Sequence, residues 1–170
     1  MRSIGVIAGA SVIAATAVGG PGAGSARADV TQPEINGTYA ATSNGEWART
    51  NDVYHDEGTI RSTWTITSSC SDPLTCSGTV TSDQGWTSAL SFIGGTWFVK
   101  RDLPGWEQCW DGTAATGHQV YRFYPVDDDG FVSAGSGTLA GEDATTGPSG
   151  ACGWNKLLVI RMPFKLVKIA

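Results

Sequence analysis

The sequence predicts an all-β fold, a small antiparallel β-barrel of about eight strands held by disulfides. Short runs rich in Thr, Val and aromatic residues alternate with turn signals such as Asn36-Gly37. One run, 59–70, alternates apolar and polar side chains with the period of a strand, and no dozen residues show a helical apolar stripe. The alternative is a β-sandwich, but a closed barrel leaves no exposed sheet edge and is therefore preferred.

The expected strands follow one another with short antiparallel connections. In the run 59–70, Trp64 and Ile66 share the buried face. We expect an ordered loop at 102–117 and another at 141–153, and Pro163 should mark an edge or a bulge because it lacks an N–H. The expected strands are 38–42, a less regular one at 47–55, 59–70, 76–82, 86–93, 96–101, 119–126 and 131–140, and the segments 157–162 and 164–169 close the chain as one bent strand or two.

The first 28 residues have the pattern of a secretory signal peptide, which leaves 29–170 as a single β domain. Arg2 precedes an apolar run over 4–20, and Ala26-Arg27-Ala28 fits the small-x-small cleavage rule. A membrane anchor is the alternative, but the run is shorter and less apolar than a span of about 20 residues requires. We therefore expect a protein that is secreted or held at the cell envelope.

The charge of the chain limits its partners. The net charge is −5 at pH 7, and cleavage would remove Arg2 and Arg27 and make the protein more acidic. An acidic surface repels phosphate backbones, so we expect no nucleic acid partner. No second apolar stretch of spanning length follows residue 28, so we expect no membrane span in the mature chain.

Four cysteines, an even number, indicate disulfides in an exported protein. Three pairings are open, and we favour Cys70 with Cys76 and Cys109 with Cys152. The first pair closes a short loop that contains Asp72-Pro73, and the second ties the middle of the chain to its last strand. A metal site is the rival interpretation, but no Cys-x-x-Cys spacing is present; we expect no metal and no cofactor.

Several runs resemble a group of small secreted proteins of mycobacteria and related actinobacteria. They are Gly37-Thr38-Tyr39, Ser43-Asn44-Gly45-Glu46-Trp47, Trp64-Thr65-Ile66-Thr67-Ser68-Ser69-Cys70, Cys76-Ser77-Gly78-Thr79-Val80 and Ser82-Asp83-Gln84-Gly85-Trp86. The resemblance implies export and carries no catalytic residues. The opening Gly37-x-Tyr39 is also similar to the Gly-x-Trp opening of lipocalin-like barrels, with Tyr in the third place, which makes it an analogy of fold.

Two polar clusters could carry chemistry, and each has a simpler explanation. His55-Asp56-Glu57 could bind a metal or transfer protons, yet on a strand only His55 and Glu57 share a side, and a polar turn explains the cluster. The acidic run 127–130 suggests calcium, but Phe131 and Thr138 occupy the fifth and twelfth positions of the required loop. We therefore interpret it as a turn.

No known catalytic motif occurs in the chain. Gly-x-Ser-x-Gly, His-Glu-x-x-His and phosphate-binding loops are all absent from the sequence. A hydrolase that uses His55 or His118 remains the last of our hypotheses, because triads are set by space and not by spacing. The sequence leaves enzymatic activity open and favours a non-catalytic role.

The seven tryptophans are the most unusual feature of the composition. Trp64 and Trp97 lie within strands and are expected in the core. If Cys109 and Cys152 join, three indoles gather around one disulfide, either as packing or as a binding platform. The candidate ligand-binding residues are Trp86, Trp106, Trp110 and Trp154.

These observations favour a secreted binding module that takes a lipid, another apolar small molecule or an envelope glycan at an aromatic-lined mouth. The alternative is a secreted factor that binds a protein partner at the cell envelope or a host surface. A side-chain-filled interior with an exposed aromatic patch would favour the alternative.

Overall fold

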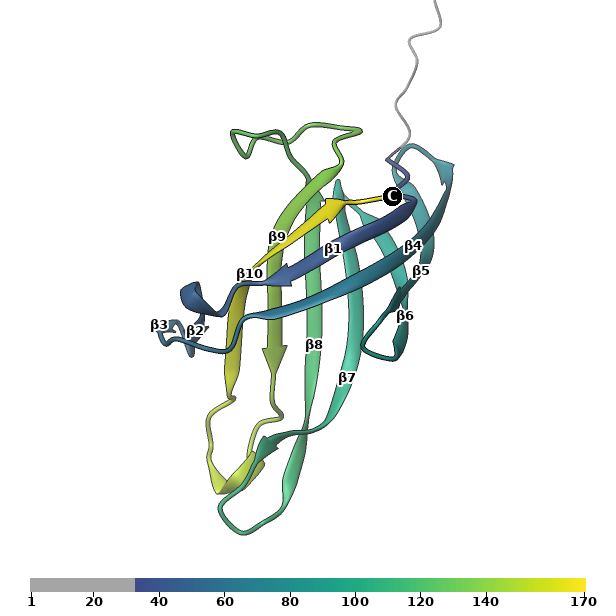
Figure 1. Ribbon diagram of the computed structural model, residues 1–170. Helices are drawn as coiled ribbons and strands as arrows, with labels where there is room; N and C mark the ends of the chain where they lie inside the picture. The colour runs from purple at the N-terminus through teal and green to yellow at the C-terminus, as the bar shows by residue number, and fades with distance from the viewer. Residues whose placement is uncertain (1–32) are drawn as a thin grey trace, which may run out of the picture.

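The computed structural model describes residues 33–170, and its architecture is a closed antiparallel barrel of eight strands (Figure 1). Each strand pairs with the next, and β10 closes the ring on β1. The predicted barrel is confirmed, and the fold is not a sandwich. The barrel strands are β1 (Gly37–Ser43), β4 (Ile60–Asp72), β5 (Thr75–Ser82), β6 (Trp86–Ile93), β7 (Thr96–Gln108), β8 (Ala114–Pro125), β9 (Thr138–Thr146) and β10 (Val159–Lys168).

Strands β7 and β8 extend beyond the others at one end of the barrel, beside the β9–β10 loop (Figure 1). We call this end the long end. The opposite, short end holds the β6–β7 turn and the C-terminus (Figure 1). The predicted signal peptide, residues 1–28, lies outside the described residues, so its boundary with the domain at 29–170 stays a prediction.

Among residues 33–170, no helix is both long and apolar enough to cross a membrane.

The segment predicted as one irregular strand over 47–55 is instead a short helix and a hairpin. The 3-10 helix η1 (Gly45–Trp47) leads into β2 (Arg49–Thr50) and β3 (Val53–Tyr54). The hairpin turns at Asn51 and Asp52, whose φ angles of 50° and 67° are left-handed, a conformation that Asn and Asp tolerate. Only β2 pairs with the barrel, on β10.

The predicted loop over 102–117 is mostly strand. β7 continues to Gln108 and β8 begins at Ala114, so that a short loop alone connects them. Pro104 and Gly105 interrupt the pairing, and the register shifts between Leu103 and Glu107. A bulge therefore takes up the residues that break a strand pattern. The strand predicted at 131–140 likewise begins only at Thr138 and continues to Thr146, into the segment predicted as a loop.

Pro163 lies inside a continuous strand and not at a sheet edge. β10 pairs with β9 from Val159 to Val167. On its other side it pairs with β2 at residues 160–161 and with β1 over residues 164–168. The Pro163 carbonyl accepts a hydrogen bond from the Asn44 N–H, so the proline backbone faces the point where β1 ends. The missing N–H of Pro163 therefore lies between the stretch of β10 that pairs with β2 and the stretch that pairs with β1, so neither ladder loses a hydrogen bond.

The barrel interior is filled, and its two halves differ in polarity. Large apolar side chains pack toward the short end and the middle, and each contributes roughly 1.5–3 kcal/mol by burial. The polar buried side chains gather toward the long end. The apolar set includes Trp64, Trp97, Phe123, Ile66, Leu90, Leu139, Leu166, Val80 and Val99; the polar set is Ser43, Ser82, Gln119, Asp143 and Thr145.

One disulfide lies at each end of the barrel, and the pairing is the one that the sequence favoured. Cys70 and Cys76 join β4 to β5 beside their turn. Cys109, which follows β7, is bonded to Cys152 in η2 (Ala151–Gly153) of the β9–β10 loop. Disulfides are typical of proteins that work outside the cytosol.

Candidate functional site

Three tryptophans meet around the Cys109–Cys152 disulfide at the long end. Trp106, Trp110 and Trp154 line a hollow of about 480 Å³ together with the disulfide, and we call these three side chains the indole platform. Trp110 is 86% exposed and Trp154 is 68% exposed. Exposure of so large an apolar side chain to water is unfavourable, and these two indoles contribute little to the core. Core packing therefore does not explain why they are present.

Trp106 anchors the platform because it packs against the barrel backbone. A Cβ at Gly117 would lie 2.7 Å from the Trp106 ring, so only glycine permits this close approach. The next residue, Glu107, has a buried Oε2 atom with no hydrogen-bond partner among residues 33–170. Glu107 also lines the hollow, so a carboxylate stands beside the indoles.

Trp86, the fourth predicted site residue, does not join the platform. It lies at the polar half of the barrel, where its ring stacks on Tyr121 at 6.4 Å and meets the edge of Trp64 at 5.3 Å. The Arg101 guanidinium lies 4.3 Å from the centre of the Trp86 ring. The structure therefore divides the four predicted tryptophans between two places.

A chain of hydrogen bonds crosses the polar half from β7 to β1. Arg101 Nε donates to Gln119 Oε1 at 2.6 Å, and Gln119 Nε2 donates to Asp143 Oδ1 at 2.7 Å. The Ser43 hydroxyl donates to Asp143 Oδ2 at 2.6 Å. Each side chain sits at an inward position of its strand, so alternation in four strands builds one connected network.

Burial controls the ionisation of this network. Loss of water raises the pKa of Asp143, while the hydrogen bonds from Ser43 and Gln119 and the Arg101 charge oppose the shift. Burial also raises the pKa of the Tyr121 hydroxyl above its usual value, and the charge of Asp143 adds to the effect. The Asp143 carboxyl is therefore held in an environment that penalises its charge.

The network is reached through a gap in the barrel wall. β6 and β7 pair only from Leu90 and Val99 to Ile93 and Thr96, so they separate toward the long end. The Ser88 hydroxyl donates to the Lys100 carbonyl at 2.6 Å and is a bridge across the gap. A hollow of about 630 Å³ lies here, lined among others by Trp86, Arg101 and Gln119.

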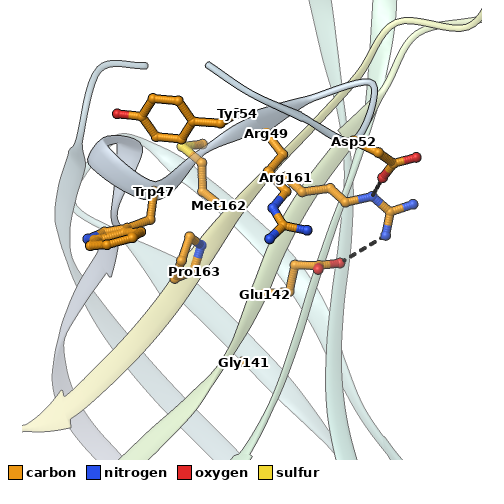
Figure 2. A pocket seen from close by; sticks show the side chains of 9 residues that line it. All are labelled: Trp47, Arg49, Asp52, Tyr54, Gly141, Glu142, Arg161, Met162 and Pro163. Atoms are coloured by element: carbon orange, nitrogen blue, oxygen red, sulfur yellow. Dashed lines mark hydrogen bonds and ion pairs between the residues drawn. The ribbon is translucent and has the colours of Figure 1, made fainter. Parts of the chain in front are cut away.

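A groove on the outer surface combines aromatic and charged side chains (Figure 2). Figure 2 shows Trp47 and Tyr54 on one side, with the charged side chains of Arg161 and Glu142 on the other. Arg161 contacts Glu142 at 3.4 Å and Asp52 at 3.9 Å. The β2–β3 hairpin, which lies outside the barrel, supplies much of this groove, whose volume is about 600 Å³.

The short end carries an apolar hollow that the sequence did not predict. Its volume is about 360 Å³, and Ile35, Tyr39 and Phe92 form part of its wall. The loop over 126–137 supplies Val132 to the same wall. This hollow is remote from the indole platform, so apolar and indole-rich surfaces occupy opposite ends of the barrel.

Both histidines lie at the surface in pairs with carboxylates. His55 Nδ1 lies 3.0 Å from Glu57 Oε1, and His118 Nδ1 lies 2.6 Å from Asp102 Oδ1. Within residues 33–170, neither ring makes a hydrogen bond to a hydroxyl or thiol that could act as a nucleophile. His55 and Glu57 share a side, as the sequence allowed, and their pair lies at the surface.

The acidic segment over 127–130 forms a turn. Asp127 Oδ1 accepts hydrogen bonds from the N–H groups of Asp129 and Phe131, and Gly130 has a φ of 86°. In the described part of the chain, no three His, Cys, Asp or Glu side chains are placed to hold a metal ion.

No family model matches the chain, and no curated protein does. Among solved structures, the barrel is similar to the sensor domain of PknI from M. tuberculosis in its monomer form. The fold is shared with a mycobacterial sensor domain. The TM-score is 0.57 with 17% sequence identity, over 81% of this chain and 88% of that chain. At this identity the likeness concerns the fold, and the predicted link to lipocalin-like barrels stays a prediction.

Sequence reasoning missed Arg101, Gln119, Asp143 and Ser43 as a group. A signal was present in β8, where Gly117, Gln119, Tyr121 and Phe123 share the inward face. A glutamine in an otherwise apolar inward series indicates a buried partner. The partner itself depends on which residues of β7 and β9 lie opposite, which the sequence does not specify.

Proposed function

We propose that this protein is a non-catalytic binding domain that works outside the cytosol and takes a carbohydrate on the indole platform. The observation that carries the proposal is the exposure of Trp110 and Trp154 beside a half-buried Trp106. Indole faces offer flat apolar surface to sugar rings, and the carboxylate of Glu107 can accept hydrogen bonds from hydroxyl groups. The disulfides, the predicted signal peptide and the fold shared with a sensor domain support a role outside the cytosol.

The packing of the interior favours a carbohydrate over an enclosed apolar ligand. Trp64, Trp97 and Phe123 fill the middle of the barrel and are almost completely buried. A lipid chain would need to displace them, and each such displacement costs roughly 1.5–3 kcal/mol of burial. A ligand that lies on the surface avoids this cost.

The proposal is tested by titration of tryptophan fluorescence with soluble fragments of envelope glycans. We expect a saturable change that Trp110→Ala and Trp154→Ala each weaken at least tenfold, because each removes about half of the exposed stacking surface. Phe131→Ala is the matched control, since Phe131 is an exposed aromatic residue outside the platform. No response across glycans of varied charge and linkage, or equal binding by all three variants, would contradict the proposal.

A protein partner at the outer groove is the second candidate function. Trp, Tyr and Arg dominate the binding energy of protein interfaces, and Trp47, Tyr54 and Arg49 are all exposed in this groove. The test is a pull-down from envelope extracts with the native protein and with the double variant Trp47→Ala, Tyr54→Ala. A partner retained by Trp110→Ala and lost by the double variant supports this function; a partner retained by both contradicts it.

A further inference from the structure

Arg101 is a cation without a carboxylate partner inside the mouth of an acidic protein. No Asp or Glu oxygen of residues 33–170 lies within 4.0 Å of its guanidinium. Arg122 of β8 and Arg161 of β10, on the two strands that flank β9, both contact Glu142. Since the net charge of the chain is −5, carboxylates are plentiful, yet none contacts Arg101 directly, and Asp143 reaches it only through Gln119. The guanidinium therefore has room for a direct acceptor.

The Arg101 guanidinium is held in a fixed orientation. Nε donates to Gln119, and the guanidinium carbon lies 4.3 Å from the centre of the Trp86 ring. These two contacts restrict the guanidinium, and no carboxylate of residues 33–170 contacts its two terminal nitrogens. Paired terminal nitrogens of arginine match the two oxygens of a carboxylate or phosphate group.

A buried chain supports this orientation at a cost in stability. Gln119 is held by Asp143, which is fully buried and held in turn by Ser43. A buried carboxyl is expensive, and a network that costs stability indicates a role in positioning. Outer hydrogen-bond partners of this kind orient the groups that contact a ligand.

The surroundings of Arg101 admit an anion from solvent. Arg101 and Gln119 both line the hollow at the gap between β6 and β7, so the guanidinium is accessible. Lys100 lines the same hollow and adds a second positive charge. Asp102 also lines it, and its carboxylate is hydrogen-bonded to His118. The hollow is large enough for a group of several atoms.

The geometry points to Arg101 as an oxyanion-binding residue, which takes the carboxylate or phosphate group of a ligand that enters between β6 and β7. Gln119, Asp143 and Ser43 are its positioning residues. The site is separate from the indole platform, with which its hollow shares no lining residue. Its outcome is therefore independent of whether the platform binds a carbohydrate.

Nuclear magnetic resonance of the ¹⁵N-labelled protein tests the inference with three probes at constant ionic strength: sodium acetate, inorganic phosphate and neutral acetamide. We expect acetate or phosphate to shift the Trp86 indole N–H and the Gln119 amide signals in a saturable way, with acetamide inactive. The Trp110 and Trp154 indole signals should not move. Comparison of acetate with phosphate identifies which oxyanion the site prefers.

Variants distinguish a binding role of Arg101 from a purely structural one. Arg101→Gln should weaken binding of the active probe at least tenfold, and Arg101→Lys should weaken it as well, because it keeps the charge and loses the paired nitrogens. Arg122→Gln is the matched control and should bind normally. Equal shifts with acetamide, no saturable shift with either anion, or unchanged binding in both Arg101 variants would overturn the inference.

Discussion

Asp143 lowers the stability of the fold by its burial and yet belongs to a hydrogen-bond network in the interior. Its carboxyl is fully buried and receives hydrogen bonds from Ser43 and Gln119. Those bonds satisfy its oxygens but do not restore the hydration of a charge. Removal of the charge with retention of the shape is therefore the change that isolates this cost.

We predict that Asp143→Asn stabilises the protein at pH 7, by on the order of 1 kcal/mol. An amide can accept from Gln119 and donate to the Ser43 oxygen, so the bonded shape survives. Because the pKa of Asp143 is raised in the fold, the unfolded carboxyl ionises first as the pH rises. The native protein should thus lose stability relative to the variant between about pH 4 and its folded pKa. Urea unfolding at pH 4, 5.5 and 7 measures the difference, and a variant less stable at pH 7 would contradict the prediction.

At the scale of the element, strand alternation explains what the sequence could predict. Trp64, Trp97 and Ile66 are buried as expected, because the hydrophobic period of a strand is local information. The predictions failed where Pro104 and Gly105 lie, since a register shift lets the pairing resume beyond them. Turn-forming residues report local backbone preference and not the length of the strand that continues past them.

The candidate site was predicted only in part, for the same reason. Three of its tryptophans lie close to Cys109 or Cys152 in sequence, so a single disulfide was enough to bring them together. The Ser43–Asp143 contact joins residues 100 positions apart. Such a contact depends on the closure of the barrel and on the register of several ladders, which no short pattern contains.

The gap between β6 and β7 gives a prediction for the strand itself. Backbone amides without a ladder partner exchange faster than paired ones. β5 pairs with β6 along 86–92, whereas β7 pairs with it only at 90–93, so the β6 amides that point toward β7 should exchange faster within 86–89 than within 90–93. Amide exchange followed by nuclear magnetic resonance measures the difference, and uniform protection along β6 would show that the wall is closed in solution.

At the scale of the whole molecule, the Cys109–Cys152 disulfide links two loops rather than two core strands. It closes a separation of 43 residues, for which the chain-entropy model gives a stabilisation of roughly 3–4 kcal/mol. We predict that the double variant Cys109→Ser, Cys152→Ser remains a folded barrel of lower stability and loses most binding at the indole platform. Thermal unfolding and fluorescence titration measure the two effects.

The matched control is Cys70→Ser, Cys76→Ser, which removes the disulfide at the β4–β5 turn. The Cys70–Cys76 disulfide closes a shorter loop and lies outside the indole platform. Its removal should therefore cost less stability and leave binding at the platform intact. If both double variants lose binding equally, the loss follows from lower stability of the barrel, and the specific dependence of the indole platform on the Cys109–Cys152 disulfide is contradicted.

The unequal halves of the barrel interior have a consequence for how such a protein can diverge. The side chains that secure folding, such as Trp97 and Leu139, are concentrated away from the rim that carries Trp110 and Trp154. Substitutions at that rim touch few packed neighbours, so their effects on stability should be small and nearly additive. Related chains could therefore acquire new binding specificities by substitution of rim residues, while the same apolar core keeps each of them folded.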